Sequence, residues 1–487
     1  MLFSSLEFIF AFLPLVLLGY WALGAWGSLN AQKVWLVVAS LFFYAWWRPE
    51  YLGVLVGSVL VNFAVGFAIA RRQWLRPKQW LILGIAANLL LLGYFKYAVF
   101  FSGNISALTG VGFTLEQVIL PLAISFYTFQ QIAYLVDVYR GKVGQVNFLD
   151  YCLFVTFFPQ LIAGPIVHHS EMMPQFKARP TLNERYQNAC KGLFIFSIGL
   201  FKKLAIADTF AQWANAGFAS GEPLSFVDAW GTSLSYTLQL YYDFSGYTDM
   251  AIGAALLFGI KLPLNFLSPY KALSIRDFWR RWHITLSRWL RDYIYIPLGG
   301  NRALSGRVSL NLMVTFLLGG LWHGAAWGFV LWGALHGLAL VVCHLWQRLG
   351  VNLWRWAAWL LTFMFVNATW VLFRAESLAD AVRVYRGMLG LNGLPLGPWL
   401  GLDMAASAPA ATTSVMSSVA IISVALVLVA TLRLPNSVEL ADYNGPQSTK
   451  GRFAPSVGNA LWAALAFSVS VLLLMASVGS DFLYFNF

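Results

Sequence analysis

Residues Gly319–Gly337 read GGLWHGAAWGFVLWGALHG, and they place a histidine inside an apolar run that extends from about Val308 to Val342. If this run is a helix from Arg307, His323 lies roughly 24 Å along its axis, at about 1.5 Å per residue. That depth is near or past the middle of a hydrocarbon core roughly 30 Å thick. A membrane protein that keeps a titratable ring there usually uses it, and neighbouring glycines allow a close approach. The stretch predicts a functional histidine; the alternative is a structural one, bonded to a nearby carbonyl.

The composition of the whole chain is typical of a polytopic membrane protein. The chain has 487 residues, of which 59% are hydrophobic and only 11% are charged. Soluble domains of this length do not have such a composition. About a dozen apolar segments predict roughly ten to twelve spans, with one or two re-entrant pieces whose backbone protein must cover. We therefore expect an all-α membrane helix bundle, a single domain over residues 1–487, with re-entrant segments around a central cavity.

The basic residues and the cysteines exclude several other classes of protein. The formal net charge is +12, but the basic residues cluster in loops, so the positive-inside rule explains them and nucleic-acid binding is not expected. Arg71, Arg72, Arg76 and Lys78 predict a cytoplasmic loop at residues 71–79. The three cysteines have no short spacing, which argues against a CxxC metal site and a disulfide framework. No metal site is expected.

A basic and aromatic stretch, SIRDFWRRWHITLSRWLRDYIYIPLGGNR, covers Ser274–Arg302. An interfacial amphipathic helix is one interpretation, but it does not account for His283 in the middle of the stretch. On the cytoplasmic side, such a surface also suits an anionic, ring-bearing donor such as coenzyme A. Other residues of this stretch are candidates for donor or substrate binding: Trp279, Arg280, Arg281, Trp282, Arg288 and Asn301. Trp322, next to His323, is a further candidate.

A second polar stretch, LQLYYDFSGYTDMAIG, lies inside an otherwise apolar run at Leu238–Gly253. Buried carboxylates need partners, and we expect Arg or His on a facing helix. Gln239 and Asp243 are therefore candidates for substrate binding. A polar clamp that only holds helices together is the equally weighted alternative.

Two other segments are expected to depart from straight spans. In FFPQLIAGPIVHHSEMMPQF, at Phe157–Phe176, two prolines and a glycine predict a broken or re-entrant piece. His168 and His169 are adjacent, so they diverge and make a poor metal pair. The connection at 374–414 opens with an amphipathic pattern and becomes rich in Gly, Pro and Ala, which predicts a surface helix followed by a loop.

Together these motifs resemble the membrane-bound O-acyltransferases, in particular the bacterial branch with the alginate O-acetyltransferase membrane subunit and the teichoic acid D-alanyl transfer protein. The resemblance is strongest in QLYYDFSGYTDMAIG, DFWRRWHITLSRWLRDYIYIPLGGNR, GGLWHG and WVLFRAES, and the family-like motifs lie within about 117–376. It implies that His323 is the catalytic histidine and that His283 is the second characteristic polar position. The segment IVHHSEMMPQF is more similar to relatives that act on polysaccharides other than alginate.

The resemblance implies an O-acetyltransferase in the inner membrane of a bacterium. Acetyl would pass from a cytoplasmic thioester, acetyl-CoA in the first instance, to a hydroxyl on the outer side, for acetylation of alginate or a similar exopolysaccharide. Peptidoglycan or cellulose acetylation is the alternative. Neutral His323 would act as general base, and His283 would orient the thioester or donate to the oxyanion. Expected partners are a periplasmic acetyltransferase and a polysaccharide export complex, and no bound cofactor is expected.

Two interpretations from other classes stay open at this point. A polysaccharide or lipid transporter would have His323 and Asp243 in its pathway, although no internal repeat is evident, and repeats are frequent in transporters. A scaffold whose partner performs all the catalysis is the other. Replacement of His323 separates the scaffold from the enzyme.

Overall fold

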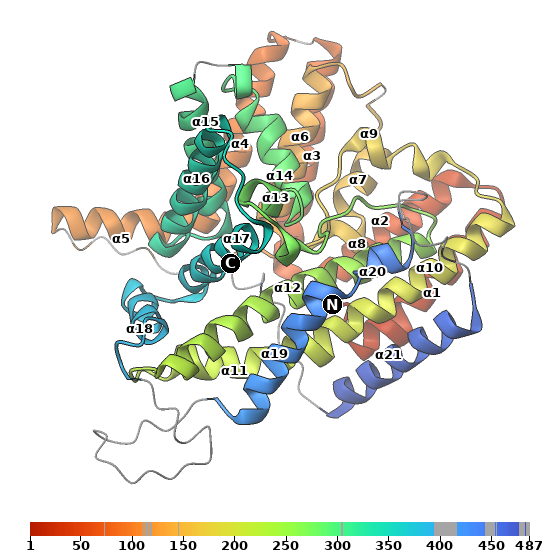
Figure 1. Cartoon of the computed structure of the whole chain (residues 1–487). Helices are drawn as coiled ribbons and strands as arrows, with labels where there is room; N and C mark the ends of the chain where they lie inside the picture. Colours follow the sequence, from red (N-terminus) through yellow and green to blue (C-terminus); the bar gives the residue numbers. More distant parts are fainter. Residues whose placement is uncertain are drawn as a thin grey trace.

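Helices are the regular secondary structure of the described part of the chain, as Figure 1 shows for this computed structural model. The structure describes residues 1–72, 74–110, 112, 115, 119–144, 146–302, 305–393, 416–443, 453, 455–476 and 483. The all-α prediction is confirmed for these residues. Their α-helices are α1 (Leu13–Ala25), α2 (Leu29–Ala45), α3 (Leu52–Arg71), α4 (Pro77–Leu92), α5 (Ala98–Thr109), α6 (Ile124–Tyr139), α7 (Phe148–Thr156), α8 (Phe158–Leu161), α9 (His169–Met172), α10 (Leu182–Phe201), α11 (Asp208–Ala219), α12 (Phe226–Leu257), α13 (Ile275–Trp279), α14 (Ile284–Leu290), α15 (Ser305–His323), α16 (Trp327–Arg348), α17 (Arg355–Arg374), α18 (Leu378–Met388), α19 (Ser418–Arg433), α20 (Ser437–Leu440) and α21 (Val457–Ala476).

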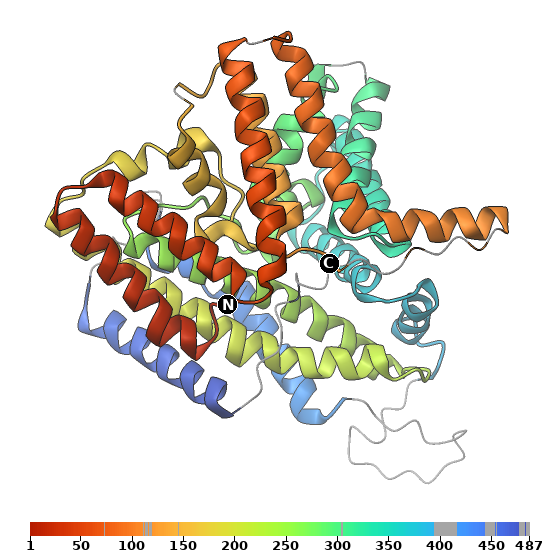
Figure 2. The ribbon, with the colours of Figure 1, turned by 180° about the vertical axis from the view of Figure 1, so that it is seen from behind.

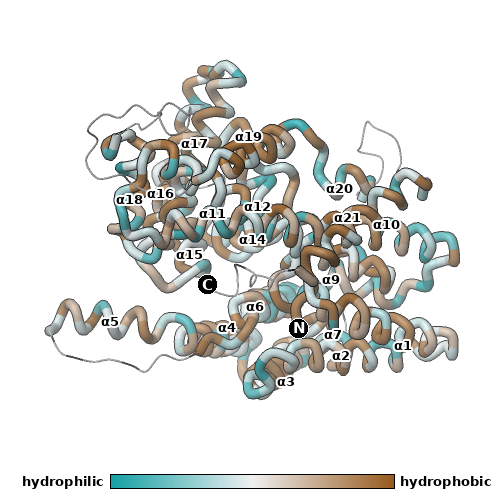
Figure 3. The backbone as a smooth tube through the Cα atoms, turned by 90° about the horizontal axis from the view of Figure 1, so that it is seen from below, coloured by the Kyte–Doolittle hydropathy of each residue, from teal (hydrophilic) through white to brown (hydrophobic). Residues whose placement is uncertain are grey.

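The protein is a multi-pass membrane protein. Six described helices are long and apolar enough to cross a membrane: Phe8–Ala25, Pro49–Arg71, Pro77–Thr109, Trp327–Arg348, Arg355–Arg374 and Val457–Ala476. Apolar residues colour long parts of these helices brown in Figure 3. The inner helices α6 and α12 are more polar, because they face protein rather than lipid. The expected number of roughly ten to twelve spans therefore stays a prediction.

Helix α12 is the centre of the bundle, and most of its side chains are buried. It packs closely on α10 at two pairs of facing glycines. A Cβ on Gly199 would lie 2.7 Å from the carbonyl oxygen of Gly246, and a Cβ on Gly192 would lie 2.8 Å from that of Gly253. Small residues at helix contacts let two backbones approach in a membrane, where lipid supplies no hydrophobic driving force. In Figures 1 and 2, α1, α2 and α21 lie at one end of the molecule, and α15, α16 and α18 lie at the other.

The apolar run around His323 is helical from before Arg307 to that residue, as expected, but it continues as the second arm of a helical hairpin rather than as the same helix. Helix α15 ends at His323, and α16 begins at Trp327 and packs against it. A Cβ on Gly320 would overlap the carbonyl oxygen of Phe329, and a Cβ on Gly333 would come against the backbone of α15. These glycines allow the second helix to fold back on the first. His323 is therefore at a helix end, where backbone carbonyls are available.

The segment after α7 is broken and buried, as its prolines and glycine predict. Its short helix α8 follows a non-helical Phe157, and every residue from Phe157 to Val167 is buried. Protein satisfies backbone groups there: Phe158 N–H donates to Ser40 Oγ at 3.0 Å, and Ile166 N–H donates to Thr285 Oγ1 at 3.0 Å. Such a backbone is tolerated at membrane depth only when protein covers it.

The amphipathic helix predicted at the start of the 374–414 connection is present as α18. Its N-terminus is capped by the Ser377 hydroxyl, which accepts from Asp380 N–H at 3.1 Å. Ala381 and Val384 are buried on its inner side, and Val382 is exposed. Residues 394–415, where we predict a loop, lie outside the described residues.

Candidate active site

His323 is the last residue of α15, and an aromatic cage surrounds its ring. The ring centroid lies 5.1 Å from those of Trp322, Trp332 and Phe373, and all three contacts are edge-to-face. The residue is only 3% exposed. The cage comes from three elements, because Trp332 is on α16 and Phe373 on α17. The ring is therefore fixed in direction by packing rather than by its own helix alone.

His283 is the N-cap of α14 and has a left-handed backbone, with φ of 43°. Its side chain is completely buried, and Nδ1 lies 3.1 Å from Asn265 Oδ1. The same Asn265 oxygen accepts from the backbone N–H of Thr285 at 3.3 Å. Because a backbone N–H can only donate, this Asn265 atom is the acceptor oxygen, and Nδ1 of His283 carries a hydrogen. In the neutral ring, the lone pair is then on Nε2.

The two predicted histidines lie together, although they come from separate stretches of the sequence. Their ring centroids are 6.4 Å apart, and Trp322 contacts both rings. Phe244 of α12 packs edge-to-face on His283 at 4.8 Å. The pair is thus built on α12, α14 and α15, at the point where the hairpin meets the central helix. The catalytic roles of both histidines stay predictions.

One side of the pair opens into a small cavity of about 200 Å³, which we name the His323 cavity. No acidic residue is among its lining residues. It is bounded by the end of α2, the turn between α4 and α5, the start of α6 and the end of α15. Its polar and aromatic lining comprises Tyr44, Trp47, Arg48, Tyr51, Lys96, Ser125, Phe126, Trp322 and His323.

A larger cavity of about 710 Å³, which we name the arginine cavity, lies beside α13, α14, α15 and α16. The predicted donor-binding residues Trp279, Arg280, Arg288 and Asn301 all line it. The charged and polar lining also includes Arg276, Ser287, Arg291, Thr315, His344, Gln347 and Arg348. Five guanidinium groups, those of Arg276, Arg280, Arg288, Arg291 and Arg348, therefore gather around this cavity.

The two cavities lie at different levels along α15. Phe316 lines the arginine cavity and His323 lines the other one, so the separation along the helix is roughly 10 Å at 1.5 Å per residue. Helix α4 begins beside the basic loop at 71–79 and leads to Lys96, whose side chain contacts the end of α15. The start of α15 and the arginine cavity are therefore on the side of the basic loop. By the positive-inside rule, this is the side that we expect to be cytoplasmic.

Four of the predicted binding residues line neither cavity. Arg281 donates to Asp277 Oδ1 at 2.8 Å, and Trp282 is buried against Trp370, at 4.9 Å between ring centroids. Asp243 is buried in an ion pair of 2.8 Å with Lys203, and Gln239 is buried in α12. The expected Arg or His partner of Asp243 is wrong, because Lys203 lies on a π-helical turn, Lys202–Ala207, that faces α12. The clamp interpretation fits this stretch better than substrate binding.

His336 lies on α16, and both of its ring nitrogens have protein partners. Its Nδ1 accepts from Trp279 Nε1–H at 3.2 Å, and its Nε2 lies 3.0 Å from Thr369 Oγ1. Thr369 donates its own hydrogen to the Val366 carbonyl at 2.9 Å, so its oxygen accepts from Nε2–H. Both ring nitrogens are therefore engaged in holding α13, α16 and α17 together.

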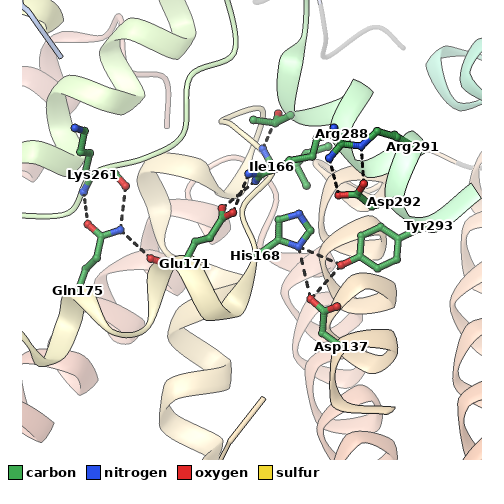
Figure 4. A network of polar contacts seen from close by, with 11 residues as sticks. Asp137, Ile166, His168, Glu171, Gln175, Lys261, Arg288, Arg291, Asp292 and Tyr293 are labelled. Atoms are coloured by element: carbon green, nitrogen blue, oxygen red, sulfur yellow. Dashed lines mark hydrogen bonds and ion pairs between the residues drawn. The ribbon is translucent and has the colours of Figure 1, made fainter. Parts of the chain in front are cut away.

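Figure 4 shows the polar network around His168, beside the arginine cavity. Tyr293 donates to Asp137 Oδ2 at 3.1 Å, and its hydroxyl lies 3.1 Å from His168 Nδ1. Arg288 forms two hydrogen bonds with Glu171, at 2.8 and 2.9 Å. The ring of His169 packs elsewhere, on Tyr134 and Phe154. Among the described residues, no group of three or more His, Cys, Asp or Glu is placed to hold a metal ion.

Sequence reasoning missed Lys96, which lines the His323 cavity. Its ammonium group donates to the carbonyl oxygen of Trp322 at 2.6 Å and to that of His323 at 3.1 Å. The available signal was a single lysine within the apolar stretch that begins near Trp80. An ionisable residue inside a span is a candidate for function by default.

Comparisons with known proteins indicate the family of the chain. Residues 81–378 match the model of the membrane-bound O-acyltransferase family. The whole chain is 48% identical to the peptidoglycan O-acetyltransferase of Helicobacter pylori, with 98% of that protein covered. It is 38% identical over its whole length to all of a protein of Azotobacter vinelandii named "Probable alginate O-acetylase AlgI". The teichoic acid D-alanyltransferase of Streptococcus thermophilus is 26% identical over 47% of this chain and 57% of that protein.

Proposed function

The chain belongs to the membrane-bound O-acyltransferase family, and from this premise we propose that it transfers acetyl from a cytoplasmic thioester for the O-acetylation of an exported polysaccharide. The protein is an O-acyltransferase. The observation that carries the proposal is the pair of buried histidines, 6.4 Å apart, with His323 in the wall of a small cavity and a basic cavity roughly 10 Å away along α15. We place the enzyme in the inner membrane of a bacterium.

For the donor we propose acetyl-CoA, bound from the cytoplasm at the arginine cavity. Its lining includes Arg276, Arg280, Arg288, Arg291 and Arg348. Guanidinium groups bind phosphate oxygens in pairs of charge-assisted hydrogen bonds. Glu171 engages Arg288 and Asp292 engages Arg291, so we propose Arg276 and Arg280 as the main candidates for the phosphates. The thioester end would then point along α15 towards the histidines.

In the proposed reaction, His323 takes the proton of the acceptor hydroxyl as its oxygen attacks the thioester carbonyl carbon. The carbon–sulfur bond then breaks, and the departing thiolate takes the proton from His323, so atoms and charge balance. The hydrogen bond between His283 and Asn265 leaves a lone pair on Nε2 of His283. Neutral His283 therefore accepts a hydrogen bond at Nε2, which favours its role in orienting the reactants over donation to the oxyanion.

The size of the His323 cavity supports a handover to a partner. Its volume of about 200 Å³ suits one side chain or one sugar ring, and not a polymer chain. We propose that the acetyl group passes from this cavity to a separate periplasmic acetyltransferase within a polysaccharide export complex. As the final acceptor we propose peptidoglycan ahead of alginate, because the identity over the whole chain is 48% to the peptidoglycan enzyme and 38% to the alginate one.

The test uses the purified protein in liposomes with radiolabelled acetyl-CoA. We expect free coenzyme A and acetate, because water takes the acetyl group while the partner is absent. This release should depend on His323 and survive in the matched control His169→Gln, whose ring lies outside both cavities. Polysaccharide should stay unmodified until the periplasmic partner is added. A protein that consumes no acetyl thioester contradicts the enzyme and supports a transporter, whereas full acetylation of the polymer by the protein alone contradicts the handover.

The acceptor is tested in cells that lack this protein. We expect the O-acetyl content of their peptidoglycan, measured by mass spectrometry of the digested wall, to fall while that of any exopolysaccharide is unchanged. The opposite pattern would assign the enzyme to the exopolysaccharide.

A further inference from the structure

Lys96 lies on the π-helical turn Gly93–Tyr97, between α4 and α5, and its side chain faces the His323 cavity. Among the described residues, its ammonium group has no carboxylate within 4.0 Å. A cation inside a membrane helix costs free energy, and such a group normally has a carboxylate or carbonyl partner. The partners of Lys96 therefore indicate its role.

The ammonium group of Lys96 makes three hydrogen bonds, to the end of α15 and to the neighbouring wall of the His323 cavity. The ammonium lies 2.6 Å from the Trp322 carbonyl oxygen, 3.1 Å from that of His323 and 3.3 Å from Ser125 Oγ. Three acceptors match the three N–H donors of an ammonium group. The hydroxyl of Tyr97, the next residue, donates to the Leu321 carbonyl at 2.7 Å.

These carbonyls belong to the last turn of α15, which has no helical N–H donors beyond it. A positive charge at a helix C-terminus also interacts favourably with the helix dipole. The chain leaves the helix directly after His323, because the hairpin turns there. Lys96 thus holds the peptide group of the residue whose ring is at the centre of the site. The π-helical turn adds a residue to α4, and such insertions are frequent at functional sites.

We propose that Lys96 is a positioning residue for His323: its ammonium group caps α15 and fixes the direction in which the histidine ring enters the cavity. This inference rests on the proposed function, because it assumes that His323 acts on an acceptor in the cavity. It predicts an effect on turnover and little effect on donor binding, since the arginine cavity lies roughly 10 Å away along α15.

The experiment compares Lys96→Met with the matched control Tyr97→Phe in the acetyl-CoA assay. Both variants remove hydrogen bonds from the same turn to the end of α15. We expect Lys96→Met to lower kcat roughly tenfold to a hundredfold, with KM for acetyl-CoA changed less than about threefold. Tyr97→Phe should retain about half of kcat or more, because it leaves the His323 carbonyl engaged.

A chemical rescue separates the role of the charge from a loss of folding. In a protein whose Cys152, Cys190 and Cys343 are replaced by Ala, Lys96→Cys is purified and then treated with 2-bromoethylamine. The thiolate displaces bromide and forms an aminoethyl side chain that restores the ammonium group. We expect kcat of the treated protein to recover at least about fivefold over the same untreated protein.

Two results would overturn the proposal: kcat of Lys96→Met near that of wild type, or a Lys96→Cys protein that stays inactive after complete alkylation. A wild-type protein that releases no coenzyme A would instead contradict the proposed function itself. The two failures are therefore distinguishable in one assay.

Discussion

The protein buries titratable side chains in two regions, and a comparison of the two distinguishes a candidate active site from a clamp, that is, ion pairs that only hold helices together. Where α10 meets α12, Lys202 pairs with Asp249 at 2.7 Å and Lys203 pairs with Asp243 at 2.8 Å. These charges face one another and line neither cavity. At the end of α15, His323 and Lys96 line a cavity, and no carboxylate is in its wall. Burial of an ionisable group in a membrane protein is thus not enough to indicate a functional site. A buried group that also lines a cavity is the stronger candidate.

The largest expected effect is at His323. Replacement by Ala should lower acetyl transfer by about 10²–10⁴-fold, since that is the typical contribution of a general base. Expression and membrane insertion should stay near normal, because the ring is held by aromatic contacts from other elements rather than by an ion pair. The measurement is coenzyme A release by purified protein. Activity above about a tenth of wild type would mean that His323 is not a general base, and the two regions would then not differ as site and clamp.

The second largest effect is expected at His283. His283→Ala should lower transfer by up to about 10²-fold, because loss of orientation by about 1 Å has a cost of this size. Steady-state kinetics with acetyl-CoA measure it, and Asn265→Ala should reproduce part of the loss by releasing the ring. Unchanged kcat and KM in both variants would mean that the buried His283 serves packing alone.

A smaller and more specific effect is expected in the arginine cavity. Arg280→Ala should raise KM for acetyl-CoA about tenfold, which corresponds to about 1.4 kcal/mol, because it removes a charge that faces the donor. Its neighbour Arg281 is the matched control, since it is bound to Asp277 and does not line the cavity. Equal effects of the two substitutions would mean that the basic stretch acts only through its total charge.

The smallest effect on activity is expected in the clamp. Lys203→Met leaves Asp243 buried without its ion-pair partner, and breaking a buried pair typically destabilises a protein by about 3–5 kcal/mol. We expect a lower melting temperature in detergent, with the specific activity of the folded protein within about twofold of wild type. The double variant Lys203→Met, Asp243→Leu should recover part of the stability. Loss of turnover in a folded clamp variant would make the clamp part of the site.

Some of the candidate residues could be found from a pattern in their own stretch of sequence, and others could not. His323 and His283 stood out because each interrupts a pattern of its own stretch, an apolar run in one case and an interfacial helix in the other. Asp243 stood out for the same reason, but its partner Lys203 lies on another helix, and no local period predicts that pairing. Lys96 was missed because a lysine near the end of an apolar helix usually reaches the interface.

By itself, the sequence determined that this is an all-α membrane protein, that its basic loop is on one side, and that its motifs belong to an O-acyltransferase. Composition, apolar length and motif identity are properties of short stretches, so they can be read without the fold. Only the tertiary structure decided that the run around His323 turns back after that residue, because the glycines that permit the turn act through contact between two helices. It also decided which groups share the site: the 6.4 Å between the histidine rings and the Lys96 cap join segments far apart in the chain.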